Sequence, residues 1–327
     1  MPDVVCLGEM LIDFVSTQSG VPLSHAPGFL KAAGGAPANV AVGLSRLGVS
    51  SGFIGKVGDD EFGRFLAETL ASNGVDVSGL QFTRAAKTTL AFVSIKENGE
   101  RDFMFYRDPG ADELLAADEI DGSYVRSARI FHFGSIGLIA ESSREATWAA
   151  LKTATLGDVL ISYDPNLRPP LWPSLAEARE RILEGLGWAQ VVKVSEEELE
   201  FLSGVSGLDR GAGILTKGRE ELLLVVTLGE RGCYYRAGGC SGRVSGFKVA
   251  TVDTTGAGDA FVAGLLAQIL WAAPGPGGTW KMSPRDLEHY LTYANAAGAL
   301  TTTKRGAIPA LPTRGEVEAF LRGQVPS

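Results

Sequence analysis

Residues 252–261 read Val-Asp-Thr-Thr-Gly-Ala-Gly-Asp-Ala-Phe, a glycine turn that leads directly into an apolar pattern. Apolar residues then recur at helical spacing as far as Ile269, which predicts a buried helix beginning near Gly258. A Gly-x-Gly turn at a helix start directs several backbone N–H groups to one point, where the helix dipole adds about half a positive charge. We therefore predict an anion hole formed by Gly256, Ala257 and Gly258, suited to a phosphate or to charge developing during phosphoryl transfer.

Asp259 directly follows these glycines. It could be no more than a favourable acid in the first turn of a helix. That reading leaves its place beside Gly256–Gly258 unexplained, because a carboxylate there repels a bound phosphate. Phosphoryl transfer depends mainly on orienting the nucleophile and neutralising charge. We therefore interpret Asp259 as the base that accepts the proton of an attacking hydroxyl.

Outside this segment, short β-branched runs alternate with helical patterns along the chain. Near-continuous apolar runs between helices are typical of a parallel sheet that is covered on both faces. We expect one α/β domain over residues 1–327, with a doubly wound, mostly parallel sheet. The expected strands are 4–7, 53–57, 130–133, 159–163, 191–194 and 222–227, and the expected helices are 37–47, 61–71, 143–155 and 175–186.

One region departs from this alternation. Two alternating runs, residues 89–95 and 101–107, flank Asn98-Gly99, which is a strong hairpin signal. Together with the short runs within residues 12–30, they predict a small antiparallel sheet outside the main one. This sheet could be a lid over a pocket or a simple edge hairpin, and the sequence favours neither.

The bulk composition excludes several classes of protein. The chain has 327 residues, of which 45% are hydrophobic and 21% charged, as in folded soluble proteins. Its formal net charge is -8 and it has no lysine or arginine cluster, so we expect no nucleic-acid partner. No run of 18 apolar residues exists, so we expect no membrane partner. The three cysteines lack metal-ligand spacing and the N-terminus lacks a signal-peptide pattern, which favours a cytoplasmic location.

Two common nucleotide-binding motifs are missing from the sequence. Residues 213–219 read Gly-Ile-Leu-Thr-Lys-Gly-Arg, which does not have the spacing of a Walker A motif. The first expected strand is followed by residues 8–13, Gly-Glu-Met-Leu-Ile-Asp, and not by a dinucleotide-binding glycine turn. P-loop NTPases and nicotinamide dehydrogenases are therefore disfavoured.

Two segments resemble the signatures of the ribokinase-like (PfkB) carbohydrate kinases. Residues 253–261 resemble the C-terminal signature, and residues 34–41, Gly-Gly-Ala-Pro-Ala-Asn-Val-Ala, resemble the N-terminal one. The likeness runs from Leu7 to about Pro312 and is greatest to plant-type fructokinases. The segments that carry this second likeness are 103–107, 164–172 and 304–312.

The resemblance implies a fold and an activity. Family members have one doubly wound α/β domain with a small β-sheet lid, and lid sheets sometimes pair into homodimers. The implied reaction is ATP-dependent phosphorylation of a sugar hydroxyl with Mg²⁺, first of all fructose to fructose 6-phosphate. The alternatives are a kinase of ribose, a nucleoside or 2-keto-3-deoxygluconate, and a non-catalytic kinase-like interaction protein. Retention of Gly256, Gly258 and Asp259 speaks against the last alternative.

The resemblance assigns the sugar hydroxyls to Asp13, Gly34, Gly35 and Asn39. A carboxylate and an amide suit polyols, because they accept from or donate to neighbouring hydroxyl groups. Taken singly, these residues could be a charged loop residue, a tight turn and a helix N-cap. Their order along the chain favours the sugar site.

A second group of residues is expected near the sugar and the transferred phosphoryl group. By resemblance it contains Arg107, Asp164, Asn166 and Arg168. Arg107 could equally form an ordinary surface salt bridge. Asp164 and Asn166 follow an apolar strand, at the edge where open α/β sheets bind ligands. In residues 107–112, Asp and Gly replace the Asn and Ser common in fructokinases, and an extra carboxylate there could alter sugar preference.

The resemblance also implies a nucleotide site and two metal sites. The residues assigned to the nucleotide are Lys193, Ser195, Thr227, Gly229, Gly232 and Asn295. Asp253, Thr255 and Gly306 match positions where some family members bind K⁺. Glu198 matches an acid that organises Mg²⁺ through water, although with Ser195 it also forms a capping-box pattern.

Overall fold

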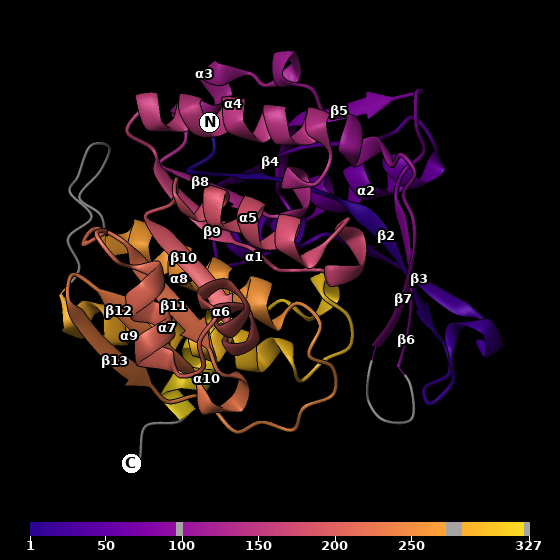
Figure 1. Cartoon of the computed structure of the whole chain (residues 1–327). Helices are drawn as coiled ribbons and strands as arrows, with labels where there is room; N and C mark the ends of the chain where they lie inside the picture. The colour runs from indigo at the N-terminus through magenta and orange to yellow at the C-terminus, as the bar shows by residue number, and fades with distance from the viewer. Residues whose placement is uncertain (96–100, 273–282, 324–327) are drawn as a thin grey trace.

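The computed structural model describes residues 1–95, 101–272 and 283–323. A large sheet with helices on both faces is joined to a smaller sheet at one side (Figure 1). The doubly wound α/β fold expected from the sequence is confirmed. In the described part of the chain, no helix combines the length and hydropathy needed to cross a membrane.

The large sheet has nine strands in the order β13-β12-β11-β10-β9-β8-β1-β4-β5. Every pairing from β11 to β5 is parallel, and β12 and β13 form an antiparallel edge. The strands are β1 (Val4–Leu7), β4 (Ser51–Gly58), β5 (Asp76–Thr83), β8 (Ile130–Gly134), β9 (Leu160–Asp164), β10 (Val191–Ser195), β11 (Leu223–Thr227), β12 (Cys233–Ala237) and β13 (Cys240–Val244). The chain moves in one direction from β1 to β5 and in the other from β8 to β13. Open α/β sheets bind ligands where the strand order reverses in this way, here between β1 and β8.

Helices cover both faces of this sheet because alternate residues of each strand face opposite sides. Val4 and Cys6 of β1 contribute to one buried core, whereas Val5 and Leu7 contribute to the other. The first core includes α1, α2, α8, α9 and α10, and the second includes α3 to α7. The helices are α1 (Ala36–Arg46), α2 (Glu61–Ser72), α3 (Gly122–Ser127), α4 (Glu141–Leu156), α5 (Leu175–Leu186), α6 (Glu196–Ser203), α7 (Leu208–Leu215), α8 (Ala257–Ala272), α9 (Pro284–Thr301) and α10 (Arg314–Gly323).

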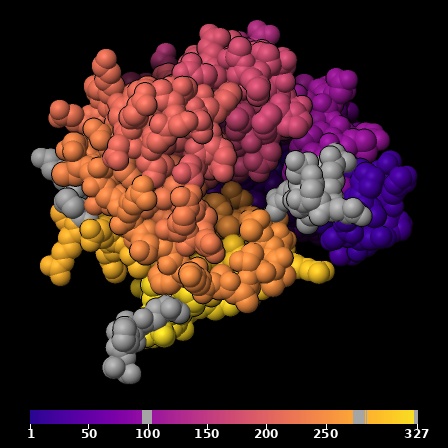
Figure 2. Space-filling view, turned by 60° about the horizontal axis from the view of Figure 1, so that its bottom comes forward, coloured from indigo at the N-terminus to yellow at the C-terminus, as the bar shows by residue number. Residues whose placement is uncertain are grey.

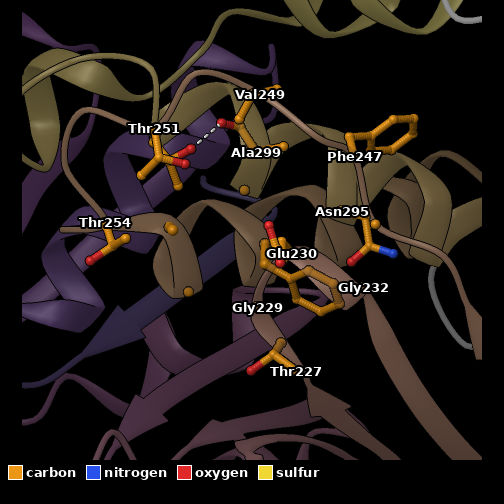
Figure 3. A pocket seen from close by; sticks show the side chains of 16 residues that line it. Thr227, Gly229, Glu230, Gly232, Phe247, Val249, Thr251, Thr254, Asn295 and Ala299 are labelled. Carbon is orange, nitrogen blue, oxygen red and sulfur yellow. Dashed lines mark hydrogen bonds between the residues drawn. The ribbon is translucent and has the colours of Figure 1, made fainter.

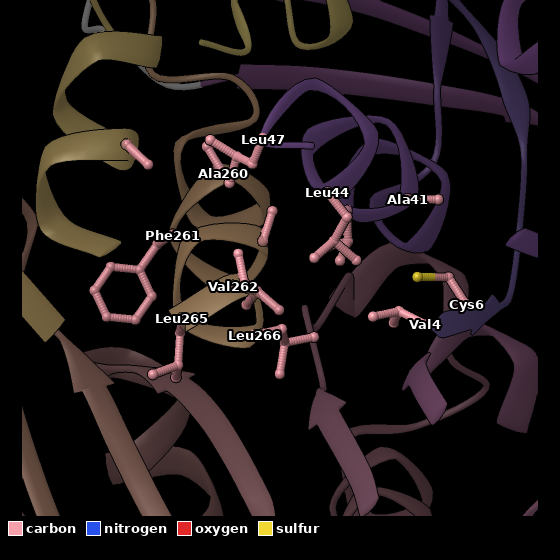
Figure 4. Close-up of a cluster of buried hydrophobic side chains, with 14 of the residues drawn as sticks. Val4, Cys6, Ala41, Leu44, Leu47, Ala260, Phe261, Val262, Leu265 and Leu266 are labelled. Carbon is pink, nitrogen blue, oxygen red and sulfur yellow. The ribbon is translucent and has the colours of Figure 1, made fainter. Parts of the chain in front are cut away.

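Close packing of α1 against α8 brings the two signature segments together. Figure 4 shows Leu44 of α1 facing Val262 and Leu266 of α8 above β1. A Cβ on Gly43 would lie only 2.8 Å from the Cβ of Ala263, so the two helices approach this closely because Gly43 has no side chain. The packing holds the starts of both helices on the same side of the molecule.

The small sheet has four strands in the order β3-β2-β6-β7. They are β2 (Leu11–Ser16), β3 (Phe29–Gly34), β6 (Leu90–Ile95) and β7 (Arg101–Tyr106). The two outer pairings are antiparallel, as expected, but the central pairing of β2 with β6 is parallel. β2 follows β1 and β6 follows β5, and since β1 and β5 both run parallel to β4, the chain leaves the large sheet at the same edge before each of the two strands. The expected turn at Asn98-Gly99 lies outside the described residues.

Candidate active site

A cavity of about 320 Å³ lies between the small sheet and the carboxyl ends of the large-sheet strands. Figure 2 shows a recess between the orange C-terminal half and the indigo N-terminal strands. Twelve of the residues singled out in the sequence line the cavity. They are Asp13, Gly35, Asn39, Asn166, Arg168, Lys193, Asp253, Thr255, Gly256, Gly258, Asp259 and Gly306.

Asp259 lies in the first turn of α8 and is only 6% exposed. Its Oδ2 accepts a 2.8 Å hydrogen bond from Nδ2 of Asn39, which lies in the first turn of α1. Burial raises the pKa of Asp259 to about 6, and the Asn39 hydrogen bond opposes this shift. A carboxylate with a pKa this close to neutrality is well suited to accept a proton near physiological pH.

Asn39 has a second polar atom available in this cavity. Its Oδ1 is buried and has no hydrogen-bond partner among the described residues. A buried acceptor without a partner costs free energy, so such atoms usually mark a ligand or water position. The amide of Asn39 can therefore donate to Asp259 while its oxygen accepts from a ligand hydroxyl.

The glycine turn before α8 has the backbone conformation that its sequence predicts. Gly256 has a φ of 78°, in the region that disfavours a side chain, and a Cβ there would lie 3.0 Å from Cα of Ala307. A Cβ on Gly258 would lie 3.2 Å from Nζ of Lys193. Because Gly258 has no side chain, nothing separates the backbone at the start of α8 from the Lys193 ammonium group. The Ala257 amide donates a long 3.3 Å hydrogen bond to the Thr254 carbonyl oxygen.

Lys193 provides a buried positive charge beside this helix start. Its Nζ lies 3.2 and 3.1 Å from the two carboxylate oxygens of Asp164, at the end of the neighbouring strand β9. Burial alone would lower the pKa of Lys193, but the charges of Asp164 and Glu198 raise it above its ordinary value. The ammonium group therefore remains charged where it can attract a phosphoryl group.

The loop after β9 is held by α6. Asn166 has a φ of 47° and its amide donates to Oδ1 of Asp164 at 3.1 Å. Glu198 accepts the amide of Leu167 at one carboxylate oxygen and that of Ser195 at the other, both at 2.7 Å. Ser195 Oγ in turn accepts the Glu198 amide, which completes the capping box. Glu198 thus joins α6 to the loop that carries Arg168.

Arg107 lies behind the cavity and is not among its lining residues. Its guanidinium group donates from Nε and Nη2 to Oδ2 of Asp112 at 2.9 and 2.7 Å, and Nη1 lies 3.4 Å from Glu113. The side chains of Arg107 and Asp112 are each only 4% exposed, so this is a buried ion pair and not a surface one. Asp108, which replaces the common asparagine, is exposed and does not line the cavity.

The residues matched to a K⁺ site come together around one carboxylate. Asp253 Oδ1 accepts from both the amide and the hydroxyl of Thr255, at 2.9 and 2.7 Å, and Oδ2 accepts the Gly306 amide at 2.9 Å. Within the described residues, no group of three or more His, Cys, Asp or Glu side chains could hold a metal ion. A monovalent ion here would therefore depend largely on backbone oxygens.

A second cavity of about 350 Å³ lies on the other side of the α8 start. It is lined by Thr227, Gly229, Gly232 and Asn295, all assigned to the nucleotide from the sequence (Figure 3). Asn295 Nδ2 donates to the Val244 and Ser245 carbonyl oxygens, which directs its own oxygen elsewhere. Both cavities are lined by Thr254 and Gly258, so they meet where the anion hole is expected.

Sequence reasoning missed Glu9 as a residue of this site. It follows β1, lines the first cavity, is 3% exposed, and accepts the Ala36 amide at 2.9 Å through Oε1. The local signal was an acid two residues after a buried strand, which does not by itself identify a partner at the start of α1. Gly34 and Asp164 lie beside the cavity without lining it, and a Cβ on Gly34 would collide with the Asp13 carboxylate.

Comparison with known proteins gives concordant matches over nearly the whole chain. The profile of the pfkB family carbohydrate kinases matches residues 1–314. Probable fructokinase-4 of Arabidopsis thaliana is 52% identical over 320 residues, covering 98% of this chain and 97% of the relative.

Solved structures agree with this match. The fructokinase from Xylella fastidiosa with bound ATP superposes with a TM-score of 0.90 at 36% identity, covering 99% of each chain. A double-mutant fructokinase from Vibrio cholerae O395, in its fructose, ADP and potassium ion bound form, gives 0.85 at 36% identity and covers 98% of each chain. With one profile, a close relative and matching folds in agreement, the chain belongs to the pfkB family of carbohydrate kinases.

Proposed function

We propose that this protein transfers the γ-phosphoryl group of ATP to a sugar hydroxyl, converting fructose to fructose 6-phosphate. The observation that carries the proposal is the meeting of two cavities at Gly258, with the buried Asp259 carboxylate on one side. The name of the Arabidopsis thaliana relative and the ligands of the two solved fructokinases support the same reaction.

The sugar cavity supplies the groups that orient a polyol. Asp13 and Asn39 present a carboxylate and an amide, and the backbone of Gly35 completes this part of the lining. Asp259 accepts the proton of the primary hydroxyl as its oxygen forms a bond to the γ-phosphorus. The bond from that phosphorus to the bridging oxygen of ATP breaks, and ADP leaves with the electron pair.

Positive charge around the helix start stabilises the transferred group. The backbone amides of residues 257–259 and the α8 dipole direct partial positive charge toward it. Lys193 adds a full charge from one side and Arg168 from the sugar side. We assign the nucleotide to the second cavity, with Thr227 and Asn295 among its contacts.

Two metal ions fit this scheme in different ways. Mg²⁺, when bound, neutralises the ATP phosphates, and Glu198 would reach it only through water because both its oxygens accept backbone amides. Asp253, Thr255 and Gly306 would hold K⁺ next to the anion hole. The bridging Asp253 carboxylate orders both backbone segments for that purpose.

The remaining proposals concern the choice of sugar, the location of the protein and its assembly. Because Asp108 lies outside the cavity lining, its carboxylate gives no reason to prefer another sugar over fructose. A ribose, nucleoside or 2-keto-3-deoxygluconate kinase is the alternative on this scaffold. We also propose a cytoplasmic location and pairing of small sheets in a homodimer.

A coupled ADP-release assay tests the proposal, with ATP and Mg²⁺ against fructose, ribose, glucose, adenosine and 2-keto-3-deoxygluconate. We expect turnover with fructose to exceed turnover with each other acceptor. Preferred turnover of another acceptor would reject the fructose assignment, and no turnover with any acceptor would reject the activity.

A further inference from the structure

Glu9 is a buried acid at the junction of the two sheets. It lies between β1 and β2, is 3% exposed, and contributes to the wall of the sugar cavity. Its Oε1 accepts the amide of Ala36, the first residue of α1, at 2.9 Å. Its main-chain oxygen packs against Gly35 so closely that a Cβ on Gly35 would collide with it. Glu9 therefore contacts the Gly35–Ala36 turn through both its side chain and its backbone.

The start of α1 lacks an ordinary cap. The N-cap residue Gly35 has a φ of 114° and no side chain that could accept an amide. Helix N-termini leave amides unsatisfied and favour a negative charge nearby. Glu9 supplies the missing acceptor from a neighbouring segment, next to Gly35 in the cavity lining.

The first turn of α1 connects the Glu9 contact to the proposed catalytic carboxylate of Asp259. Asn39 lies three residues after Ala36, and its backbone amide donates to the Gly35 carbonyl oxygen at 2.9 Å. The Asn39 side chain then donates to Asp259 at 2.8 Å. A shift of the Gly35–Ala36 turn would therefore move both Gly35 and Asn39, the hydrogen-bond partner of Asp259.

Packing alone does not account for an acid at this position. Glu9 Oε2 is buried and has no hydrogen-bond partner among the described residues, which costs free energy. Arg107 and Asp112 act on Glu9 electrostatically with opposite signs, and burial raises the pKa of Glu9 to about 7. An apolar side chain of similar size could fill the space but could not accept the Ala36 amide, so the acid serves this polar contact and not packing alone.

We propose that Glu9 is a positioning residue of the sugar site, which fixes Gly35 and Asn39 by capping α1 from the β1–β2 junction. This inference rests on the proposed sugar kinase activity. What matters in it is the acceptor oxygen and not the charge, since an amide oxygen can cap a helix amide as well.

Steady-state kinetics of Glu9→Ala and Glu9→Gln test the proposal, with the sugar that the wild-type enzyme turns over best. In Glu9→Ala the Ala36 amide loses its acceptor, and we expect KM for the sugar to rise about 10-fold or more while KM for ATP stays within about twofold. Glu9→Gln keeps an acceptor oxygen and should stay within about threefold of wild type in both constants. The proposed activity itself is judged on the wild type alone, so its failure is seen separately.

A matched control separates capping in general from capping at this site. Ser174→Ala removes the cap of α5, where Ser174 Oγ accepts the Glu177 amide at 3.1 Å, and should lower Tm without raising KM for the sugar. If Glu9→Ala does not fold, Glu9→Asp withdraws the acceptor by one methylene and should show the same selective rise. An unchanged sugar KM in Glu9→Ala, or in Glu9→Asp where the alanine variant does not fold, would overturn the proposal, and so would an equal loss in Glu9→Gln.

Discussion

At the scale of single residues, burial makes Asp259 more basic but lowers the folding stability of the protein at neutral pH. The carboxylate is buried beside Asp164, and both burial and that neighbouring charge raise its pKa. Asn39, Lys193 and Arg168 act in the opposite direction and limit the rise to a pKa of about 6. The proposed base is therefore ionised at neutral pH yet basic enough to accept a hydroxyl proton.

Removal of the Asn39 hydrogen bond should change the pH profile. Asn39→Ala takes away a donor that favours the ionised form, so the pKa of Asp259 rises further. Since the base acts ionised, we expect the acidic limb of kcat/KM to move to higher pH by about one unit. Asn73→Ala, which removes an amide bound to Arg46 away from the cavities, should leave the limb in place. An unmoved limb in Asn39→Ala would contradict the coupling of these two side chains.

Asp259→Asn should stabilise the folded protein above about pH 6. A pKa raised from 3.8 to about 6 means that the folded state holds the proton more tightly. The stability from this group is therefore present below about pH 4 and lost as pH rises to about 6. We expect the variant to gain roughly 1–3 kcal/mol in the free energy of unfolding at neutral pH, and little at pH 4, in urea denaturation at both values. Equal stability of the two proteins at neutral pH would contradict the assigned cost.

At the scale of elements, the start of α8 carries the proposed anion hole, which depends on its glycine turn. Gly256→Ala introduces a Cβ at a φ of 78°, 3.0 Å from Cα of Ala307, so the turn must shift. We expect kcat to fall about 10²-fold, the scale of losing one preorganised amide donor. Gly218→Ala is the matched control: its φ is 74°, no atom lies within 4 Å of the added Cβ, and activity should be retained. Normal kcat in Gly256→Ala would argue against the anion hole.

Elements with a strong local signal could be predicted from sequence. The helix expected at 175–186 is α5 with the same bounds, and the buried helix expected near Gly258 begins at Ala257. The parallel pairing of β2 with β6 could not be derived, because it depends on where both strands leave the large sheet. Hairpin signals describe neighbours in sequence and say nothing about such distant partners.

Site residues also differ in whether their role depends on nearby or on distant positions in the sequence. The Gly256–Asp259 turn could be interpreted from its own residue types, since helix dipole and glycine geometry act locally. Glu9 could not, because its role depends on Ala36, 27 positions away in sequence. The buried Arg107–Asp112 ion pair could not be predicted either, because the sequence does not indicate that both side chains are buried.

At the scale of the whole molecule, the small sheet faces the large one across the proposed sugar cavity. Its junctions are tied by backbone contacts, among them Ile12 N to Thr89 O at 3.0 Å and Ala111 N to Lys87 O at 2.9 Å. We expect sugar to increase amide hydrogen-exchange protection in β2 and β6, because closure shields the reaction from water, whereas ATP alone should protect these strands little. Equal protection by both ligands, or none by sugar, would exclude a sugar-driven lid.

The most direct measurement of the central claim is single-turnover phosphoryl transfer by Asp259→Asn, with nucleotide affinity measured on the same protein. We expect a rate lower by about 10²–10⁴-fold, the contribution of a positioned base, with ATP affinity within about threefold of wild type. The asparagine keeps the size of the side chain and can still accept from Asn39. A transfer rate close to that of the wild type would contradict the assignment of Asp259 as the base.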